Sequence, residues 1–212
     1  MAEATAPRRR GPQARAARND RALVEAAREI FLSQGFDAPV SAIAERAGVG
    51  MGSLYRRYRT KEELLQRLCA DSMEHLAEAA KAGLAIDDPW QGLASYVQRC
   101  ARSGFGALSP LAGTVEVTSE MRQAGEQAQR LADELVTRAR DAGVIRAGVT
   151  SMDVFLLIRQ FGRPAAGPSP HVEEEVRSRL LAIALDGLKA HNTDPLPGEP
   201  PDPQHYQALW NT

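Results

Sequence analysis

The sequence has little cysteine, few aromatic residues and no long apolar run. Its 212 residues contain two cysteines, and aromatic residues make up 5% of the chain. Cys69 and Cys100 lie in apolar helical patterns without the spacing of metal ligands, so we expect buried, inert thiols, with a redox switch as the alternative. The longest strongly apolar run, 154–158, is far too short to span a bilayer. The basic N-terminus is not followed by the apolar stretch of a signal peptide. We therefore expect a soluble, cytoplasmic protein without a metal ion.

The patterns of common enzyme sites are also missing. The sequence contains no glycine-rich phosphate-binding loop, no set of cysteines and histidines with metal-ligand spacing, and no arrangement of a nucleophile with a base. The four histidines are scattered along the chain, at positions 75, 171, 191 and 205. These absences argue against an enzyme and against a bound cofactor. A binding protein is the class that we expect.

Charge is nearly balanced overall but is unevenly distributed. The net charge of −1 conceals a basic N-terminal part, because residues 1–62 contain 12 lysines and arginines against 7 acidic residues, whereas the rest of the chain is acidic. A basic module attached to an acidic body is typical of a protein that binds nucleic acid through one of its domains. A helical protein-interaction module is the alternative class.

Alanine and leucine are plentiful and runs of β-branched residues are few, which favours helices over strands. Capping signals mark several helix starts, among them Thr60 with Glu63, and Asp88 before Pro89. A short irregular helix is expected within 103–119, although 114–117 could instead form a strand. The sequence predicts an all-α fold of about nine helices, the others at 18–34, 42–47, 52–58, 61–83, 89–103, 120–142, 151–162 and 171–190.

The same signals divide the chain into four segments. Residues 1–17 are rich in Ala, Arg and Pro and are expected to form a disordered basic arm, which either enters the minor groove of DNA or only solubilises the chain. Residues 18–62 are expected to form a unit of three short helices, and residues 63–192 a larger helical body. Residues 193–212 contain five prolines and are expected to form an extended tail.

Three residues within the 18–62 unit have the spacing of a helix-turn-helix. This fold needs a small residue where its two helices cross, a glycine with φ > 0 in the turn, and an apolar anchor beneath the second helix. Ala44, Gly48 and Leu54 meet these needs at separations of four and six residues. The second of the two helices is then placed to enter the major groove of DNA.

The residues around this turn resemble the tetracycline-repressor (TetR) family of regulators. The run 52–64 matches the family's pattern of a small residue, Leu-Tyr, a basic or histidine residue, an aromatic residue and then Lys-x-x-Leu. One departure is Arg57, at a position that is often histidine in the family. The resemblance is strong over 19–70 and looser beyond residue 80. There it rests on Asp-Pro-Trp at 88–90, Ala-Gly-Val-Ile-Arg at 142–146, Leu-Asp-Gly-Leu at 185–188 and Pro-Leu-Pro-Gly at 195–198.

The resemblance implies a helix-turn-helix DNA-binding domain at 18–62, and side-chain chemistry assigns its contacts. Hydroxyl groups and cations hold phosphates, whereas groups on the exposed side of the second helix reach the base edges. Tyr58 is expected in the core, and a solvated charge is the alternative for Arg56. The expected phosphate contacts are Ser41, Tyr55, Arg57 and Lys61, and the expected base-facing residues are Met51, Ser53 and Arg56. Gly52 is also expected at the DNA interface.

The resemblance also implies that residues 63–192 bind a ligand and dimerise. Helix 151–162 is apolar nearly all round, so a second subunit could cover one of its sides. Arg159 on this helix needs an anion, either an internal carboxylate or an acidic ligand. Ordinary core packing is the alternative for each pocket residue. The expected pocket residues are Met73, Tyr96, Cys100, Phe105, Leu135, Phe155 and Arg159, and the expected dimer contacts are Val154, Leu157, Val176, Leu180, Ile183, Ala184, Gly187 and Leu188.

These expectations together describe a homodimer that binds a palindromic operator in double-stranded DNA. A repressor released by a small-molecule effector is the leading hypothesis. An activator or a ligand-independent regulator of the same fold is the alternative. The sequence identifies neither the operator nor the effector.

Overall fold

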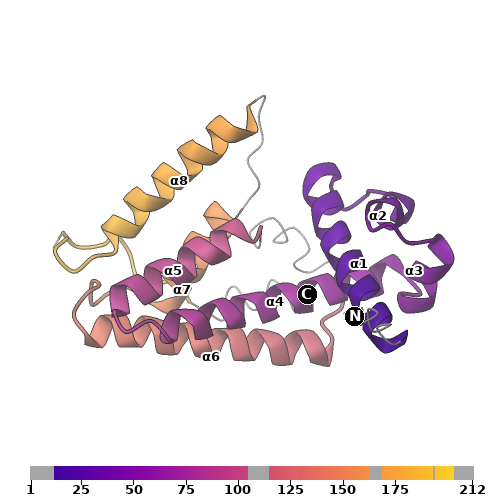
Figure 1. Cartoon of the computed structure of the whole chain (residues 1–212). Helices are drawn as coiled ribbons and strands as arrows, with labels where there is room; N and C mark the ends of the chain where they lie inside the picture. The colour runs from indigo at the N-terminus through magenta and orange to yellow at the C-terminus, as the bar shows by residue number, and fades with distance from the viewer. Residues whose placement is uncertain (1–11, 105–114, 163–168, 193, 203–212) are drawn as a thin grey trace, which may run out of the picture. The chain divides into compact units, whose positions relative to one another are not determined.

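The chain is helical throughout most of the part that the structure describes. This computed structural model describes residues 12–104, 115–162, 169–192 and 194–202. These ranges contain eight helices and no strand, apart from a single antiparallel bridge between Ile145 and Lys189 (Figure 1). None of these helices is both long and apolar enough to cross a membrane. The helices are α1 (Pro12–Gln34), α2 (Val40–Arg46), α3 (Met51–Arg57), α4 (Lys61–Leu84), α5 (Pro89–Arg102), α6 (Ser119–Asp141), α7 (Ser151–Phe161) and α8 (Pro170–Gly187).

The predicted all-α class is confirmed, with differences in two elements. The irregular helix expected at 103–119 falls largely on residues outside the described ranges, and residues 115–118 form neither a helix nor a strand. The disordered arm expected at 1–17 is wrong for residues 12–17, which form the first turns of α1. Alanine and arginine are good helix formers, and Pro12 occupies the first helical position, where its missing N–H group costs nothing.

Local hydrogen bonds fix where several helices begin. The hydroxyl of Thr60 accepts a hydrogen bond from the N–H of Glu63 (3.1 Å), as the sequence predicts, whereas the Glu63 carboxylate accepts from the N–H of Arg59 (2.6 Å). The carboxylate of Asp88 caps α5 by accepting from the N–H of Gln91 (2.9 Å). Such bonds satisfy donors that a helix leaves unpaired at its first turn.

The chain divides into two compact units, residues 1–68 and 69–212, and the boundary falls inside α4. The N-terminal unit contains α1, α2, α3 and the first turns of α4. Its core includes Phe31 from α1 and Leu54 from α3, both almost completely buried. Gly48, in the turn between α2 and α3, has a φ of +66°, which confirms the expectation from its spacing. Only glycine adopts this conformation without strain.

The core of the C-terminal unit is rich in alanine. Eight of its 21 buried core residues are alanines, contributed by α4, α5 and α6. Small side chains let helix backbones approach closely, and this happens where Gly83 of α4 faces Gly92 of α5. A Cβ atom added to Gly92 would lie 2.5 Å from the carbonyl oxygen of Gly83, and one added to Gly83 would lie 2.8 Å from the carbonyl oxygen of Gly92. Only glycine fits at this crossing without a shift of the helices.

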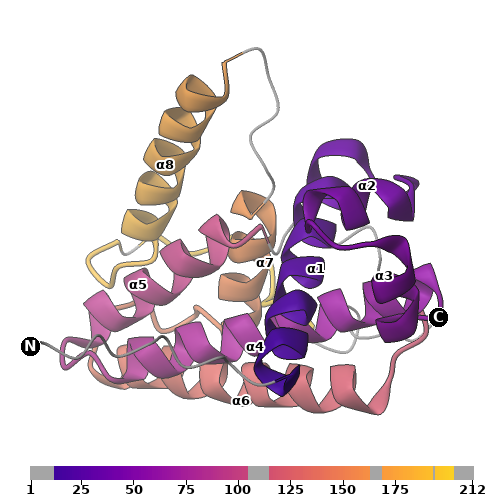
Figure 2. The ribbon, with the colours of Figure 1, turned by 45° about the vertical axis from the view of Figure 1, so that its right-hand side comes forward.

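Helix α8 lies to one side of α5 and α7 in both views (Figures 1 and 2). Its inner face packs Leu181 and Leu185 into the core. Nearer its start, the guanidinium of Arg177 donates to the carbonyl oxygens of Ala101 (3.0 Å) and Phe161 (2.6 Å), in the last turns of α5 and α7. A cation is favourable at a helix C-terminus, where carbonyl groups lack helical partners. Arg177 therefore joins three helices.

Candidate nucleic-acid interface

The exposed side of α3 brings four of the predicted residues together. The helix has seven residues, of which Leu54 is the buried one. Met51 and Tyr55 lie one turn apart and are 38% and 48% exposed. Gly52 and Arg56, beside them, are exposed as well. This face therefore presents an apolar, an aromatic and a cationic side chain to solvent.

The two predicted serines lie in different settings, one on α2 and one on α3. Ser41 is exposed in the first turn of α2, where backbone N–H groups have no helical acceptors. Ser53 is half-buried, and its hydroxyl accepts a hydrogen bond from the guanidinium of Arg56 (3.0 Å). Arg56 is therefore exposed and at the same time oriented by its neighbour on α3.

Arg57 binds a carboxylate of the same unit. Its Nε and one terminal nitrogen donate to the two oxygens of Asp20 at 2.7 and 3.0 Å, a two-point ion pair. The hydroxyl of Tyr58 donates to the same carboxylate (2.5 Å), and the Arg57 guanidinium lies 5.1 Å from the centre of the Tyr58 ring. The ring of Tyr58 is buried, in agreement with the expected core position.

The pKa values of Asp20 and Tyr58 follow from the same contacts. Burial raises the pKa of Asp20, but the hydrogen bonds from Arg57 and Tyr58 outweigh burial, and the net pKa lies below the ordinary value for aspartic acid. Burial, together with the hydrogen bond to Asp20, raises the pKa of the Tyr58 hydroxyl. Asp20 is therefore charged and Tyr58 neutral at neutral pH.

Lys61 also binds atoms of its own unit. Its Nζ donates to the carbonyl oxygen of Ala38 (2.9 Å) and lies 5.6 Å from the centre of the Phe31 ring. Arg57 and Lys61, which the sequence analysis placed on phosphates together with Tyr55, thus link helices of the N-terminal unit.

Asp20 is the residue of this region that the sequence analysis missed. It lies in α1, 37 positions before Arg57, so no helical spacing or local motif connects the two. The one signal in the sequence is its charge, because Asp20 is an acidic residue between Arg18 and Arg21 in the basic part of the chain.

The predicted ligand-binding residues lie mostly in one apolar region of the C-terminal unit. Tyr96 and Cys100 on α5 and Leu135 on α6 are buried in its core. Met73 and Phe155 are partly buried and pack against the same cluster. The structure thus brings side chains from four helices together, as the sequence analysis expected.

The buried hydroxyl and thiol groups in this region are neutral. Burial raises the pKa of the Cys100 thiol to about 12, and burial together with Cys100 raises the pKa of the Tyr96 hydroxyl. Arg159 is half-buried on α7. Phe105, the remaining predicted pocket residue, lies outside the described residues.

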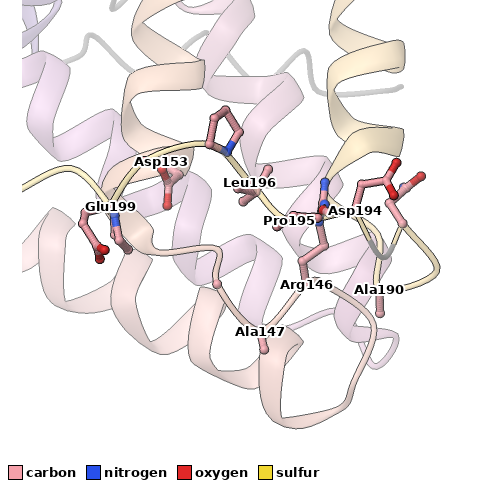
Figure 3. Close-up of a pocket in the computed structure, with 13 residues that line it drawn as sticks. Arg146, Ala147, Asp153, Ala190, Asp194, Pro195, Leu196 and Glu199 are labelled. Atoms are coloured by element: carbon pink, nitrogen blue, oxygen red, sulfur yellow. The ribbon is translucent and has the colours of Figure 1, made fainter.

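A cavity of about 400 Å³ lies where the chain after α8 passes the loop before α7 (Figure 3). The sequence analysis did not anticipate it. At its wall the guanidinium of Arg146 donates to the carbonyl oxygens of Gly187 and Asp194. The carboxylate of Asp153 accepts from both the N–H and the hydroxyl of Thr150. Arg146 thus holds the chain after α8 against the loop, and Asp153 fixes the start of α7.

An apolar stripe runs along the outer face of α8. Val172, Val176, Leu180 and Ile183 follow one another at spacings of four, four and three residues, and each is between 48% and 58% exposed. Such spacing places side chains on one face of a helix. We call these four residues the α8 stripe. Three of them are predicted dimer contacts, and Val172 is an addition.

The other predicted dimer contacts differ in exposure. Ala184 and Leu188 are half-buried and Gly187 is exposed near the end of α8, and Leu157 on α7 is half-buried. Val154 is only 1% exposed, because it points from α7 into the core of its own unit. The expectation that Val154 contacts a second subunit is therefore wrong.

Comparisons with known proteins place both units. The family described as bacterial regulatory proteins, tetR family, matches residues 23–68. The family described as transcriptional regulator SbtR-like, C-terminal domain, matches residues 88–190. A crystal structure of a TetR transcription regulatory protein from Mycobacterium vanbaalenii is similar to this chain, with a TM-score of 0.63 and 27% sequence identity, over 84% of this chain and 99% of that one.

Two curated proteins are also similar to this chain, each over only part of its own length. TtgW from Pseudomonas putida, described as an uncharacterized HTH-type transcriptional regulator, is 33% identical over 72 residues, which are 34% of this chain and 54% of that protein. The chain thus matches about half the length of that relative. The A-factor receptor protein of Streptomyces griseus is 26% identical over 193 residues, covering 84% of this chain and 68% of that protein.

Proposed function

Because the chain belongs to the TetR family of bacterial transcriptional regulators, we propose that it binds operator DNA through α3 and represses transcription until a small molecule releases it. The observation that carries this proposal is the exposed face of α3, which follows a tight turn and presents Met51, Tyr55 and Arg56 to solvent. A helix presented in this way fits the major groove of DNA. Such a regulator acts where the genome is, in the cytoplasm.

The side chains of this surface divide into two roles. The hydroxyl groups of Ser41 and Tyr55 bind phosphates, which sets the register of the protein on the duplex. Met51 and Arg56 face the bases, and the Arg56 guanidinium matches the two acceptors of guanine, with Ser53 orienting it. The basic N-terminal part of the chain adds attraction that is independent of DNA sequence.

A DNA-binding titration tests this proposal. The probe is a labelled duplex from upstream of the protein's own gene, compared with a random duplex of equal length at several salt concentrations. We expect tighter binding to the first duplex, and a loss of about 1–3 kcal/mol of binding free energy in Arg56→Ala. Tyr55→Ala should also weaken binding. Arg122→Ala, which removes an exposed cation from α6, is the control and should bind as the wild type does. Unchanged affinity in both α3 variants would place the interface elsewhere.

We further propose that the protein is a homodimer joined through the α8 stripe. Four large apolar side chains on one face, each about half exposed, are unfavourable in water and favourable against a matching face. A two-fold axis at this stripe brings the same residues of two subunits together. Two copies of α3 related by that axis would read a palindromic operator.

Sedimentation velocity tests the dimer. Leu180→Glu places a charge in the stripe and should give monomers at concentrations where the wild type is dimeric. Ala182→Glu introduces the same charge at an exposed position of α8 outside the stripe, and should leave the dimer intact. A monomeric wild type, or equal effects of the two substitutions, would contradict the proposed interface.

We propose that an effector binds in the apolar region lined by Met73, Tyr96, Cys100, Leu135 and Phe155. Its walls are apolar with a few neutral polar groups, which fits a largely apolar small molecule. Thermal shift against a compound panel tests this. The name of one relative, the A-factor receptor protein, makes A-factor one compound to include. A compound that raises Tm and weakens operator binding supports a ligand-released repressor; tighter operator binding, or no effect of any compound, favours the alternative regulators.

A further inference from the structure

Helix α3 is short and has one buried residue. Seven residues do not form a stable helix alone in water, so α3 depends on tertiary contacts. Leu54 is its one buried residue and fixes the depth of the helix in the unit. One buried side chain within the helix does not by itself fix the rotation of the helix about its own axis. A second fixed point therefore decides which side chains α3 presents.

The contact of Asp20 with Arg57 and Tyr58 supplies this second point, and we call these three residues the α1 latch. Arg57 is the last residue of α3, and Tyr58 is its C-cap. Their three hydrogen bonds to one carboxylate are 2.5 to 3.0 Å long. The Asp20 side chain is 23% exposed, whereas that of Arg57 is 54% exposed, so the carboxylate is the more buried partner of the pair. A two-point ion pair fixes orientation as well as distance.

The latch also determines the direction of the neighbouring side chains. Successive residues lie about 100° apart around an α-helix. Because Arg57 is held on α1, the directions of its neighbours on α3 are fixed as well. These neighbours are Arg56 and, one turn earlier, Ser53. Met51 and Tyr55 are then turned to the side of α3 that solvent covers.

We propose that Asp20 is a positioning residue for operator recognition, which holds α3 through Arg57 and Tyr58 and keeps the Arg57 charge off the DNA phosphates. This inference rests on the proposed function. It assigns Arg57 a role other than the phosphate contact expected from its place in the sequence. The hydrogen bonds from Arg57 and Tyr58 outweigh burial and hold the pKa of Asp20 below its ordinary value, so the carboxylate that accepts them is charged at neutral pH.

The salt dependence of operator binding separates the two roles of Arg57. Each phosphate contact contributes about 0.9 to the slope of log affinity against log salt concentration. Arg57→Gln should lower the affinity for the duplex from upstream of the gene about tenfold, a typical coupling for residues in one network, while the slope stays at the wild-type value. Asp20→Asn, which keeps the shape of the side chain, should also lower this affinity. The ratio of affinities for this duplex and a random one should fall in both variants.

Three results would overturn the inference. A slope reduced by about 0.9 in Arg57→Gln means that Arg57 neutralises a phosphate. Tighter binding of Asp20→Asn to both duplexes alike means that Asp20 is only a repelling charge. If the losses of binding free energy add in the double variant of Asp20→Asn and Arg57→Gln, the two residues act independently. The latch predicts instead that the double variant binds no more weakly than the weaker-binding of the two single variants.

Two further variants keep the result interpretable. Tyr58→Phe keeps the buried ring and removes one hydrogen bond, so it tests the latch should Asp20→Asn fail to fold. We expect a smaller loss of affinity with an unchanged slope, and wild-type affinity in this variant would count against the latch. Arg56→Gln removes the neighbouring charge, which is not part of the latch. The proposed function itself fails if the wild type does not prefer the upstream duplex, an outcome independent of these variants.

Discussion

Replacement of Gly92 by alanine tests how closely α4 and α5 approach. The added Cβ would lie 2.5 Å from the carbonyl oxygen of Gly83, where an ordinary contact is 3.4–4 Å, so the two backbones must separate by about 1 Å. Overpacking of this kind costs about 1–3 kcal/mol. Alanine gains about 1 kcal/mol over glycine in a helix interior, which offsets part of this cost. We expect a net loss of up to about 2 kcal/mol in the free energy of unfolding.

Urea denaturation followed by circular dichroism measures this loss, at one fixed protein concentration because a dimer's stability depends on it. Gly125 on α6 provides the matched control, since a Cβ added there meets nothing within 4 Å. Gly125→Ala should therefore gain up to about 1 kcal/mol from helix propensity. A Gly92→Ala variant as stable as Gly125→Ala would refute the close crossing.

Three further predictions concern single side chains. Arg177→Met should lose about 1.5–3 kcal/mol of stability, because its charged hydrogen bonds to two helix ends disappear, whereas Arg179→Met, at an exposed position of the same helix, should change little in the same urea assay. The difference in stability between wild type and Asp20→Asn should be largest above pH ~4 and should shrink as the pH falls further. The reason is that a carboxylate with a depressed pKa stabilises the fold only while it is ionised. A constant difference down to pH ~3 would contradict this. Cys100 should resist iodoacetamide at pH ~8 until the protein unfolds, because burial raises its pKa to about 12, and rapid labelling of the folded protein would be inconsistent with its burial.

Local features of the fold could be predicted because local residues determine them. The positive φ of Gly48 follows from the turn that its neighbours require, and the capping role of Asp88 follows from the four residues that begin α5. The exposure of Tyr55 and the burial of Leu54 follow from helical spacing within a single short helix. In each case the interaction that decides the structure spans only a few positions of the chain.

The features that escaped prediction depend on contacts between distant segments. Nothing near Arg57 indicates that its charge is bound by Asp20, because this partner lies two helices earlier, 37 positions before Arg57 in the chain. The expectation that Val154 contacts a second subunit is wrong for another reason. An almost uniformly apolar helix such as α7 has no periodic pattern, so its sequence does not distinguish the side that packs in its own core from a side that meets a partner.

The alanine-rich interior of the C-terminal unit has a consequence for how this protein can evolve and respond. Alanine has no side-chain rotamers, so the alanine positions of this core cannot open space by rotating side chains. Truncating substitutions have little left to remove, and most damage comes from residues that are too large. At these alanine positions, room for the proposed effector has to come from displacement of whole helices. At such positions, a molecule can be accommodated only if the arrangement of the helices changes.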